Sequence, residues 1–365
     1  MILEAESGVA ERREEIEYRQ KQPAARDGGA PRDLQVRLRS WRPFPHEVAA
    51  LLYVVVGVFL LERLPVTYPR EGLVIAASMP AAGFGVCTAV LLGVRELLRR
   101  RKGRPRELPP AVEALFLFRA IVVLFPVLSV HFLLKSFIWL VNPRTWDVFL
   151  WDLDRAVHLG LSPSLFLTGA FTGRGFLRFL DLVYSNVYFL LIVVSVPLLL
   201  LVRELNRRLA FLAAYAFVWM AGSVAYLAFP AWGPVFVFPD VFEDVLRYMP
   251  GTVSVQEVLF REIHSLVNAP LAPRILRFGC VAAFPSLHLA VVTLFAAASR
   301  PVSRAWFVAN VVVVVLMLLG SVVTGYHYLV DGWAGIALGL GAFALGSRLF
   351  PATPGGVFPT LLQRP

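Results

Sequence analysis

The 365-residue sequence has little charge and few cysteines, and both shortages narrow its class. Charged residues make up 16% of the chain and hydrophobic residues 58%, and the mean hydropathy is +0.67. Apolar runs of about twenty residues recur, which is the length that an α-helix needs to cross a bilayer. The composition therefore predicts an all-α, polytopic transmembrane bundle and not a soluble globule.

Other absences exclude further classes. The apolar runs do not alternate with polar residues, as the strands of a membrane β-barrel would. The two cysteines, Cys87 and Cys280, match no metal-ligand spacing, and we expect small buried residues and not a disulfide. No internal repeat is visible, and the N-terminal region has no apolar segment of the kind that a signal peptide requires.

The apolar runs predict about eight transmembrane spans. They cover residues 48–66, 74–94, 114–141, 177–202, 209–229, 281–299, 305–324 and 328–349. From these we expect a disordered cytoplasmic tail (1–45), a transmembrane pair with a basic cytoplasmic loop (46–110), a main membrane domain (111–350) and a C-terminal tail (351–365).

The basic residues predict how the chain is oriented. The net charge of +10 comes from arginines and lysines clustered between apolar runs, which suits anionic lipid headgroups, and we expect no nucleic-acid partner. Lys and Arg in short loops remain cytoplasmic. With eight spans, the basic N-terminal tail and the segments 95–107, 203–208 and 300–304 fall on one side, so the N-terminus is predicted to be cytoplasmic.

Three titratable residues lie at the ends of apolar runs, in "FPSLHLA" (284–290) and "TGYHYLVDGWAG" (324–335). His288 opens the sixth expected span, His327 closes the seventh and Asp331 opens the eighth, so all three are predicted on the extracytoplasmic face. Such groups are costly beside hydrocarbon and usually functional. Either histidine alone would be read as structural, whereas the set of three predicts an active site.

This set suits phosphoryl transfer without a metal or other cofactor. His327 and Asp331 are four residues apart, so the carboxylate can orient the imidazole as a nucleophile toward phosphorus. His288 can then protonate the leaving oxygen. Ser286 is expected to cap the following helix, whose first amides would face an anion.

These residues resemble a known family. "PSLH" followed by "GYHYLVD" looks like the second and third signature motifs of the type 2 phosphatidic acid phosphatase superfamily. The longer segments "AFPSLHLA" and "GYHYLVDGWAG" resemble its inositol phosphorylceramide synthase branch. The resemblance implies that His327 becomes phosphohistidine, that Asp331 supports it and that His288 protonates the leaving group. The segments 142–160 and 226–236 also look like the transferase branch.

The sequence departs from the family pattern in its phosphate ligands. Gly320 and Ser321 stand where the phosphatase motif has Ser-Arg, so one phosphate-binding arginine is missing. Lys135, with Asn142 and Pro143, faintly echoes the first motif, but a lysine at a span end can equally reach out to the headgroups. Further phosphate-binding candidates are Ser286, Arg274 and Arg277.

Polar residues elsewhere leave alternatives open. Asp147, Asp154 and His158 share one helical face, which favours a helix on the membrane surface over a metal or acceptor-sugar site. The segment "VSVQEVLFREIHSLV" predicts another surface helix, a lid over the pocket. His46 and His131 are expected to be structural.

The function expected is an integral membrane phosphotransferase that acts on a phospholipid or other lipid phosphate and passes the phosphoryl-bearing group to or from inositol or another alcohol. One alternative is a lipid phosphate phosphatase with water as acceptor. The other is a transporter or binding protein that uses the same pocket without turnover.

Overall fold

The computed structural model describes residues 32–64, 70–103, 108–268 and 281–352, and within these ranges the chain is helical with no strand. The all-α prediction is confirmed. The longer helices are α2 (Arg32–Arg39), α3 (Pro45–Glu62), α4 (Arg70–Arg101), α5 (Pro110–Ser136), α7 (Asp147–Val157), α8 (Pro163–Ala170), α9 (Arg174–Leu182), α10 (Tyr188–Leu200), α11 (Leu205–Ala228), α14 (Pro250–Asn268), α15 (Leu287–Ser299), α16 (Arg304–Val323) and α17 (Leu329–Leu349). The short ones are α6 (Ile138–Val141), the π-helical turn η1 (Val183–Val187), α12 (Pro234–Val237), the 3₁₀ turn η2 (Pro239–Val241) and α13 (Glu243–Leu246).

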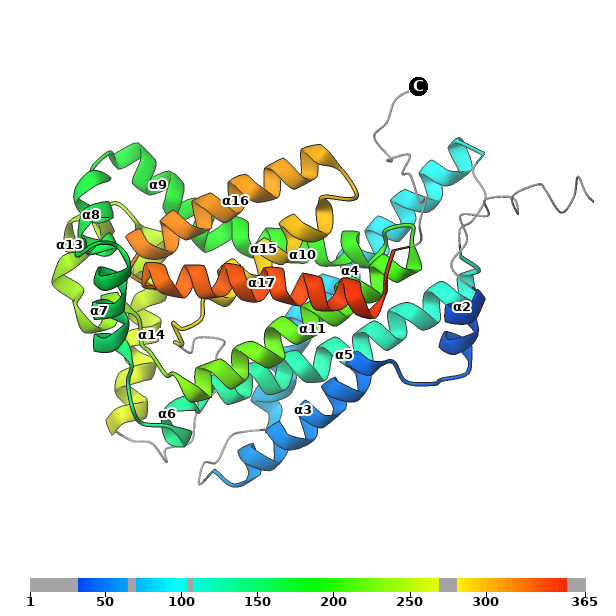
Figure 1. Ribbon diagram of the computed structural model, residues 1–365, viewed down its shortest axis with the longest axis horizontal. Coiled ribbons are helices and arrows are strands. Elements are labelled where there is room, and N and C mark those ends of the chain that lie inside the picture. The colour runs from blue at the N-terminus through cyan, green and yellow to red at the C-terminus, as the bar shows by residue number, and fades with distance from the viewer. Residues whose placement is uncertain (1–31, 65–69, 104–107, 269–280, 353–365) are drawn as a thin grey trace, which may run out of the picture.

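The spanning helices form a bundle; most of the remaining helices gather at one end of it, and α2 lies at the other (Figure 1). Within the bundle α3 packs on α5, α5 on α11, and α11 on α17. We call α7, α8 and α12–α14 the cap; they lie at the left of Figure 1. The two segments predicted as surface helices are helical, as α7 and α14, and the carboxylates of Asp147 and Asp154 on α7 are buried.

Six helices are long and apolar enough to cross a membrane. They are α3, α5, the continuous α9–η1–α10 segment, α11, α16 and α17. Of the other two predicted spans, one corresponds to α15, which has only 13 residues, and the other to α4, whose side chains through residue 83 lie outside the described residues. The chain is therefore a multi-pass membrane protein, and the count of eight stays a prediction.

Helix α15 is the centre of the bundle. Eleven of its 13 residues are buried, because it packs against α11, α16 and α17 and is apolar on all sides. Two glycines let α17 approach it closely: a Cβ on Gly335 would lie 2.2 Å from the Ser286 carbonyl oxygen, and one on Gly339 would lie 2.4 Å from that of Ala290. The first turns of α15 and α17 are thereby held side by side.

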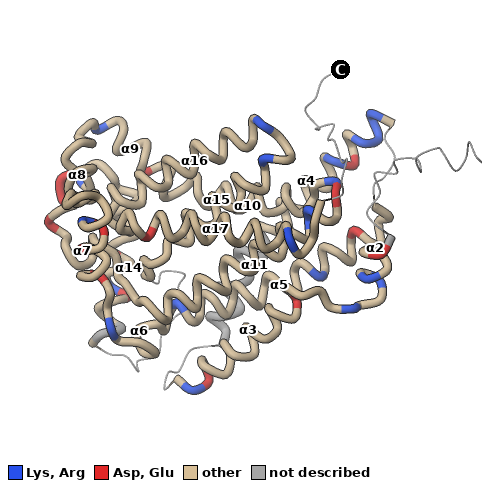
Figure 2. Tube along the Cα trace, in the orientation of Figure 1, with Lys and Arg blue, Asp and Glu red and all other residues tan. Residues whose placement is uncertain are grey.

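The two ends of the bundle differ in charge and shape. The basic turns after α4, α10 and α15 lie toward the end that carries α2, at the right of Figure 2. At that end Glu113 pairs with Arg95 and Arg208, and Arg119 forms a two-pronged salt bridge with Glu47 at 2.5 and 2.8 Å.

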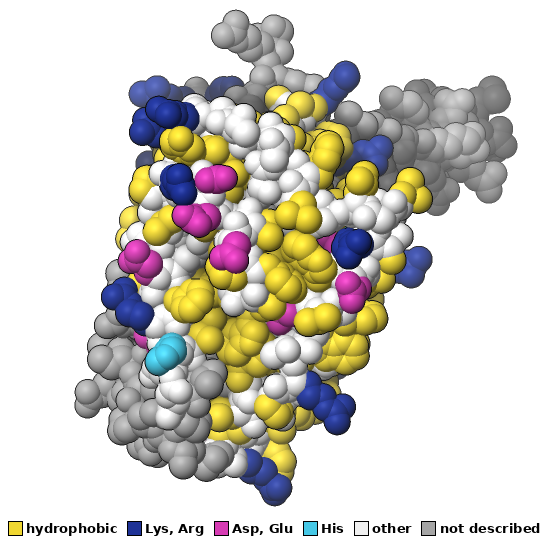
Figure 3. All heavy atoms as spheres, turned by 90° about the vertical axis from the view of Figure 1, so that its left-hand side faces the viewer, with side chains coloured by type: hydrophobic (Ala, Val, Ile, Leu, Met, Phe, Trp, Pro, Cys, Tyr) yellow, Lys and Arg dark blue, Asp and Glu magenta, His cyan; other side chains and the backbone are white. Residues whose placement is uncertain are grey.

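The cap end has an apolar centre with charged residues around it (Figure 3). A groove of about 620 Å³ crosses the cap, lined by apolar residues that include Val235, Phe236 and Phe260.

The predicted tail is partly structured. Residues 1–31 lie outside the described residues, but Arg32–Arg39 form α2, where disorder was predicted through residue 45. The reason is contact with the bundle: Leu38 is fully buried, and its carbonyl accepts a hydrogen bond from Arg119 of α5 at 3.1 Å.

Candidate active site

The first turn of α15 carries two of the predicted site residues. Ser286 caps the helix as expected, and its hydroxyl accepts a hydrogen bond from the Leu289 N–H at 3.4 Å. Its own N–H donates to the backbone carbonyl of Asp331 at 3.0 Å. Ser286 thus ties α15 to the start of α17 and places His288 beside His327.

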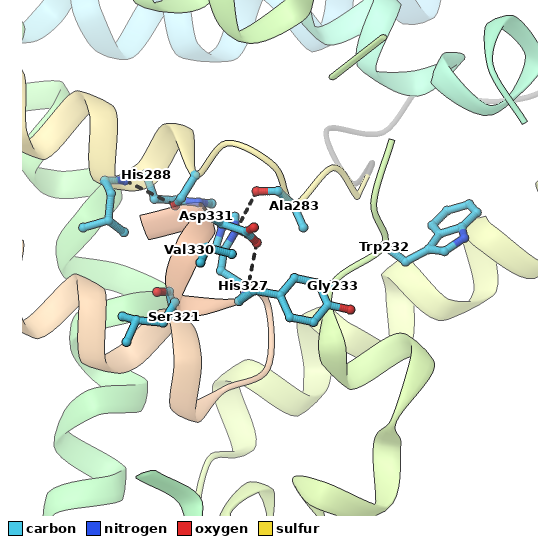
Figure 4. A network of polar contacts seen from close by, with 12 residues as sticks. Trp232, Gly233, Ala283, His288, Ser321, His327, Val330 and Asp331 are labelled. Carbon is cyan, nitrogen blue, oxygen red and sulfur yellow. Dashed lines mark hydrogen bonds and ion pairs between the residues drawn. The ribbon is translucent and has the colours of Figure 1, made fainter. Parts of the chain in front are cut away.

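His327 lies in the turn between α16 and α17, and its ring is held at both nitrogens (Figure 4). Nδ1 lies 2.8 Å from the Ala283 carbonyl oxygen, which can only accept, so Nδ1 carries the proton. Nε2 then keeps its lone pair and lies 3.4 Å from His288 Nδ1. The structure brings the two histidines together with the unprotonated nitrogen of His327 facing His288.

Asp331 lies against Nδ1 of His327, the nitrogen that also contacts the Ala283 carbonyl. Its Oδ2 is 3.4 Å from His327 Nδ1 and accepts the Tyr328 N–H at 2.9 Å. Asp331 is fully buried, and its Oδ1 has no hydrogen-bond partner among the described residues. The two residues do not share a helical face, as the spacing suggested, because α17 begins only at Leu329; the capping turn of α17 brings them together instead.

Aromatic rings that the sequence analysis missed surround His288. The ring centroids of Tyr188 and Tyr184 lie 4.5 and 5.4 Å from that of His288. Both tyrosines lie inside an apolar span and are four residues apart, which is the signal that could have found them.

Of the predicted phosphate ligands on other segments, Lys135 lies near His288. Lys135 ends α5, where its Nζ lies 5.7 Å from the ring centroid of Tyr226, and it interacts electrostatically with His288. Arg274 and Arg277 lie outside the described residues.

Asp147 braces the loop beside the site. Its carboxylate accepts the N–H groups of Trp232 and Gly233, both at 2.9 Å, and the Tyr328 hydroxyl at 3.0 Å. Burial raises the pKa of this carboxyl, while these three hydrogen bonds act in the opposite direction. The oxygens that a metal ion would need are therefore occupied by donors of the protein.

Asp154 does the same for the start of α17. Its two oxygens accept the N–H groups of Leu329 and Val330 at 2.9 and 2.8 Å. His158, the third member of the predicted face, receives a hydrogen bond from Trp333 at 3.3 Å. No group of three potential metal ligands is found among the described residues. The polar face of α7 predicted from the sequence therefore stabilises the turn that carries His327 and Asp331.

A membrane-embedded helical bundle with two histidines and a carboxylate in contact defines the class of protein. A profile of the PAP2 superfamily matches residues 148–345, more than half of the chain and the part that holds all three residues. The chain belongs to the PAP2 superfamily, and it is a phosphatase or phosphotransferase enzyme. Neither a curated protein nor a solved structure matches it.

Proposed function

We propose that this protein is an integral membrane phosphotransferase that takes a phosphoryl-bearing group from a lipid onto His327 and passes it to an alcohol such as inositol. The observation that carries the proposal is the unprotonated Nε2 of His327 facing His288 at 3.4 Å. The resemblance to the inositol phosphorylceramide synthase branch supports the choice of acceptor.

The two histidines divide the chemistry between them. The Nε2 lone pair of His327 forms a bond to phosphorus while the bond from phosphorus to the leaving oxygen breaks. His288 gives that oxygen a proton, then takes one from the incoming alcohol as it displaces His327. Asp331, against Nδ1, balances the positive charge that develops on the His327 ring.

The phosphate itself needs positive charge and hydrogen-bond donors. Lys135 is the described cation whose electrostatic interaction with His288 supports this role. Ser286 keeps a hydroxyl proton that its capping contact does not use. Arg274 and Arg277 are proposed as further ligands on their position just ahead of α15 in the sequence.

The site is proposed to face the extracytoplasmic side, with the N-terminus in the cytoplasm. The positive-inside rule supports this orientation, because the basic turns lie toward the end of the bundle that carries α2. His327 and Asp331 belong to the opposite end of α17, beside the cap.

Phosphoenzyme trapping tests the proposal. The purified protein is incubated with lipid labelled at phosphorus and quenched under alkaline conditions that preserve phosphohistidine. We expect label on the wild type and none on His327→Ala, which should also lose turnover. His264→Ala is the matched control, since this histidine is exposed on α14 and should behave as wild type.

Leaving-group dependence tests the role of His288. General acid catalysis is typically worth ~100- to 10,000-fold, and it matters less when the departing oxygen is already a weak base. His288→Ala should therefore lose less activity on a nitrophenyl phosphate than on a lipid with a poor leaving group. Equal losses on both would remove its acid role.

The acceptor is identified in the same assay. Transfer gives a labelled phosphate ester of the acceptor, which appears only when inositol or another alcohol is added. A product of free phosphate whatever alcohol is present would indicate the phosphatase alternative. Binding of the lipid without phosphoenzyme or turnover would indicate the transporter or binding protein.

A further inference from the structure

The hydroxyl of Tyr184 has no partner in the fold. Tyr184 is 6% exposed, and its hydroxyl makes no hydrogen bond to any described residue. Buried hydroxyls are normally paired, because an unpaired one has lost its hydrogen bonds to water and gained none. Tyr184 also lies in the π-helical turn η1, and such turns occur often at functional sites. These two features suggest that a bound molecule supplies the partner.

Tyr184 contacts His288 and the residue that precedes His327. Its ring centroid is 5.4 Å from that of His288. It also stacks on Tyr326, the residue before His327, at 5.4 Å with an angle of 15° between the rings. The side chain is also within electrostatic range of Asp331. A phosphate bound at the two histidines would therefore lie close to this tyrosine.

Tyr184 also packs where the family pattern has lost a residue. A Cβ on Gly320 would lie 3.2 Å from Cδ2 of Tyr184, so the glycine leaves room for the ring. Gly320 and Ser321 are the positions at which the phosphatase motif has its serine and arginine. The tyrosine ring thus packs against the position of the motif's serine, next in the chain to the position of the missing arginine.

We propose that Tyr184 is a substrate-binding residue whose O–H donates a hydrogen bond to a non-bridging oxygen of the phosphate at His327, in place of the guanidinium of the family pattern. The inference rests on the proposed function and adds a ligand to the same site. The hydroxyl adds a directed hydrogen-bond donor without adding charge. In this site Lys135 therefore contributes positive charge, and Tyr184 orients the phosphate.

Tyr184→Phe removes only the hydroxyl. Because no described residue bonds to it, the thermal unfolding midpoint should stay at the wild-type value or rise. The kcat/KM for the lipid should fall about 10- to 100-fold, the loss expected for one hydrogen bond to a charged group. Gly320→Ala, which keeps the hydroxyl but displaces the ring, should give a smaller loss.

Tyr53→Phe is the matched control. Its half-buried hydroxyl lies 2.7 Å from Ser223 Oγ, so its removal should lower the unfolding midpoint and leave kcat/KM within about threefold of wild type. The two tyrosines should thus show opposite patterns. A Tyr184→Phe protein that loses stability in proportion to activity, or keeps full activity, would overturn the inference.

Binding of orthovanadate, a phosphate analogue, separates this inference from the proposed function. Vanadate should stabilise the wild type against heat at a concentration at least tenfold lower than it stabilises Tyr184→Phe. A wild type that binds vanadate without turning over any phosphoester would refute the proposed function, while the vanadate comparison would still decide the role of Tyr184. A wild type that vanadate does not stabilise would overturn both.

Discussion

At the scale of single residues, the tautomer of His327 depends on a backbone group as much as on Asp331. The Ala283 carbonyl oxygen is nearer to Nδ1, at 2.8 Å, than the carboxylate is, at 3.4 Å. The sequence spacing predicted the pairing with Asp331, but Ala283 is 44 residues away in the chain and only the fold brings it close. In the proposed mechanism, orientation and charge balance are therefore separate contributions to the reactivity of His327.

Asp331→Asn tests this separation. The amide oxygen can still accept the Tyr328 N–H, and Ala283 still fixes the tautomer, so the variant should fold. The negative charge against His327 is lost, and kcat should fall about 100-fold or more with little change in KM. Phosphoenzyme should still form slowly, unlike in His327→Ala.

Steady-state kinetics and trapping on the Asp331→Asn protein provide the measurement. Asp152→Asn, a change on the exposed face of α7, is the control and should match the wild type. Wild-type kcat in Asp331→Asn would show that the carboxylate does not act on His327.

At the scale of helices, the site is a contact between the first turns of α15 and α17. The glycines of α17 permit this contact, because Gly335 and Gly339 lie against backbone carbonyls of α15 and no side chain fits between them. Sequence patterns located both helix starts but not their separation, because the close approach depends on which faces of the two helices meet.

Gly335→Ala should disturb this contact. Its Cβ would lie 2.2 Å from the Ser286 carbonyl oxygen, so the helices must move apart. Overpacking of this kind costs about 1–3 kcal/mol, and His288 would move away from His327, so kcat should fall at least about tenfold.

Gly341→Ala is the control for Gly335→Ala, since a Cβ at Gly341 meets nothing within 4 Å. Thermal unfolding and turnover of both variants give the comparison. Equal behaviour of the two would show that the contact between α15 and α17 does not limit activity.

Helix α7 acts on the site through backbone amides. In Asp154→Asn the side-chain NH₂ would face one of the two amides, Leu329 or Val330, that the carboxylate now accepts. A donor facing a donor leaves the buried amide unpaired, at a cost of about 1–3 kcal/mol. We expect a lower unfolding midpoint and a lower kcat, with Asp152→Asn again unchanged.

Removal of divalent metal ions tests the alternative that the polar face of α7 binds a metal. Because the Asp154 oxygens accept backbone N–H groups, turnover of the wild type should survive EDTA. Activity lost to EDTA and restored by a divalent ion would instead support the metal alternative for this face.

At the scale of the whole molecule, the sequence predicted the helical class, the superfamily and the three residues that meet, because apolar run length and short motifs are local signals. It did not predict the brace of α7, since Asp154 and Leu329 are 175 residues apart. Nor did it predict α2, whose helix depends on burial of Leu38 against the bundle.

The orientation of the whole chain can be tested with two reporter cysteines in a protein whose Cys87 and Cys280 are replaced by alanine. Glu243 is exposed in the cap, and Lys102 is exposed after α4. Three of the helical segments long and apolar enough to cross a membrane, α5, α9–η1–α10 and α11, lie between them, so we expect the two positions on opposite sides of the membrane. The basic residues around Lys102 favour the cytoplasm for that side.

A membrane-impermeant maleimide should therefore label Glu243→Cys in intact cells and Lys102→Cys only after permeabilisation. The reverse pattern would place the His327 site on the cytoplasmic side and change which lipid leaflet supplies the substrate. Labelling of both positions in intact cells would mean that an even number of segments separates them, so that one of the three does not cross the bilayer. His288 and His327 approach each other beside the cap, where α15 and α17 begin and α16 ends. The side that reacts at Glu243→Cys is therefore also the side from which the proposed lipid and acceptor must reach the histidines.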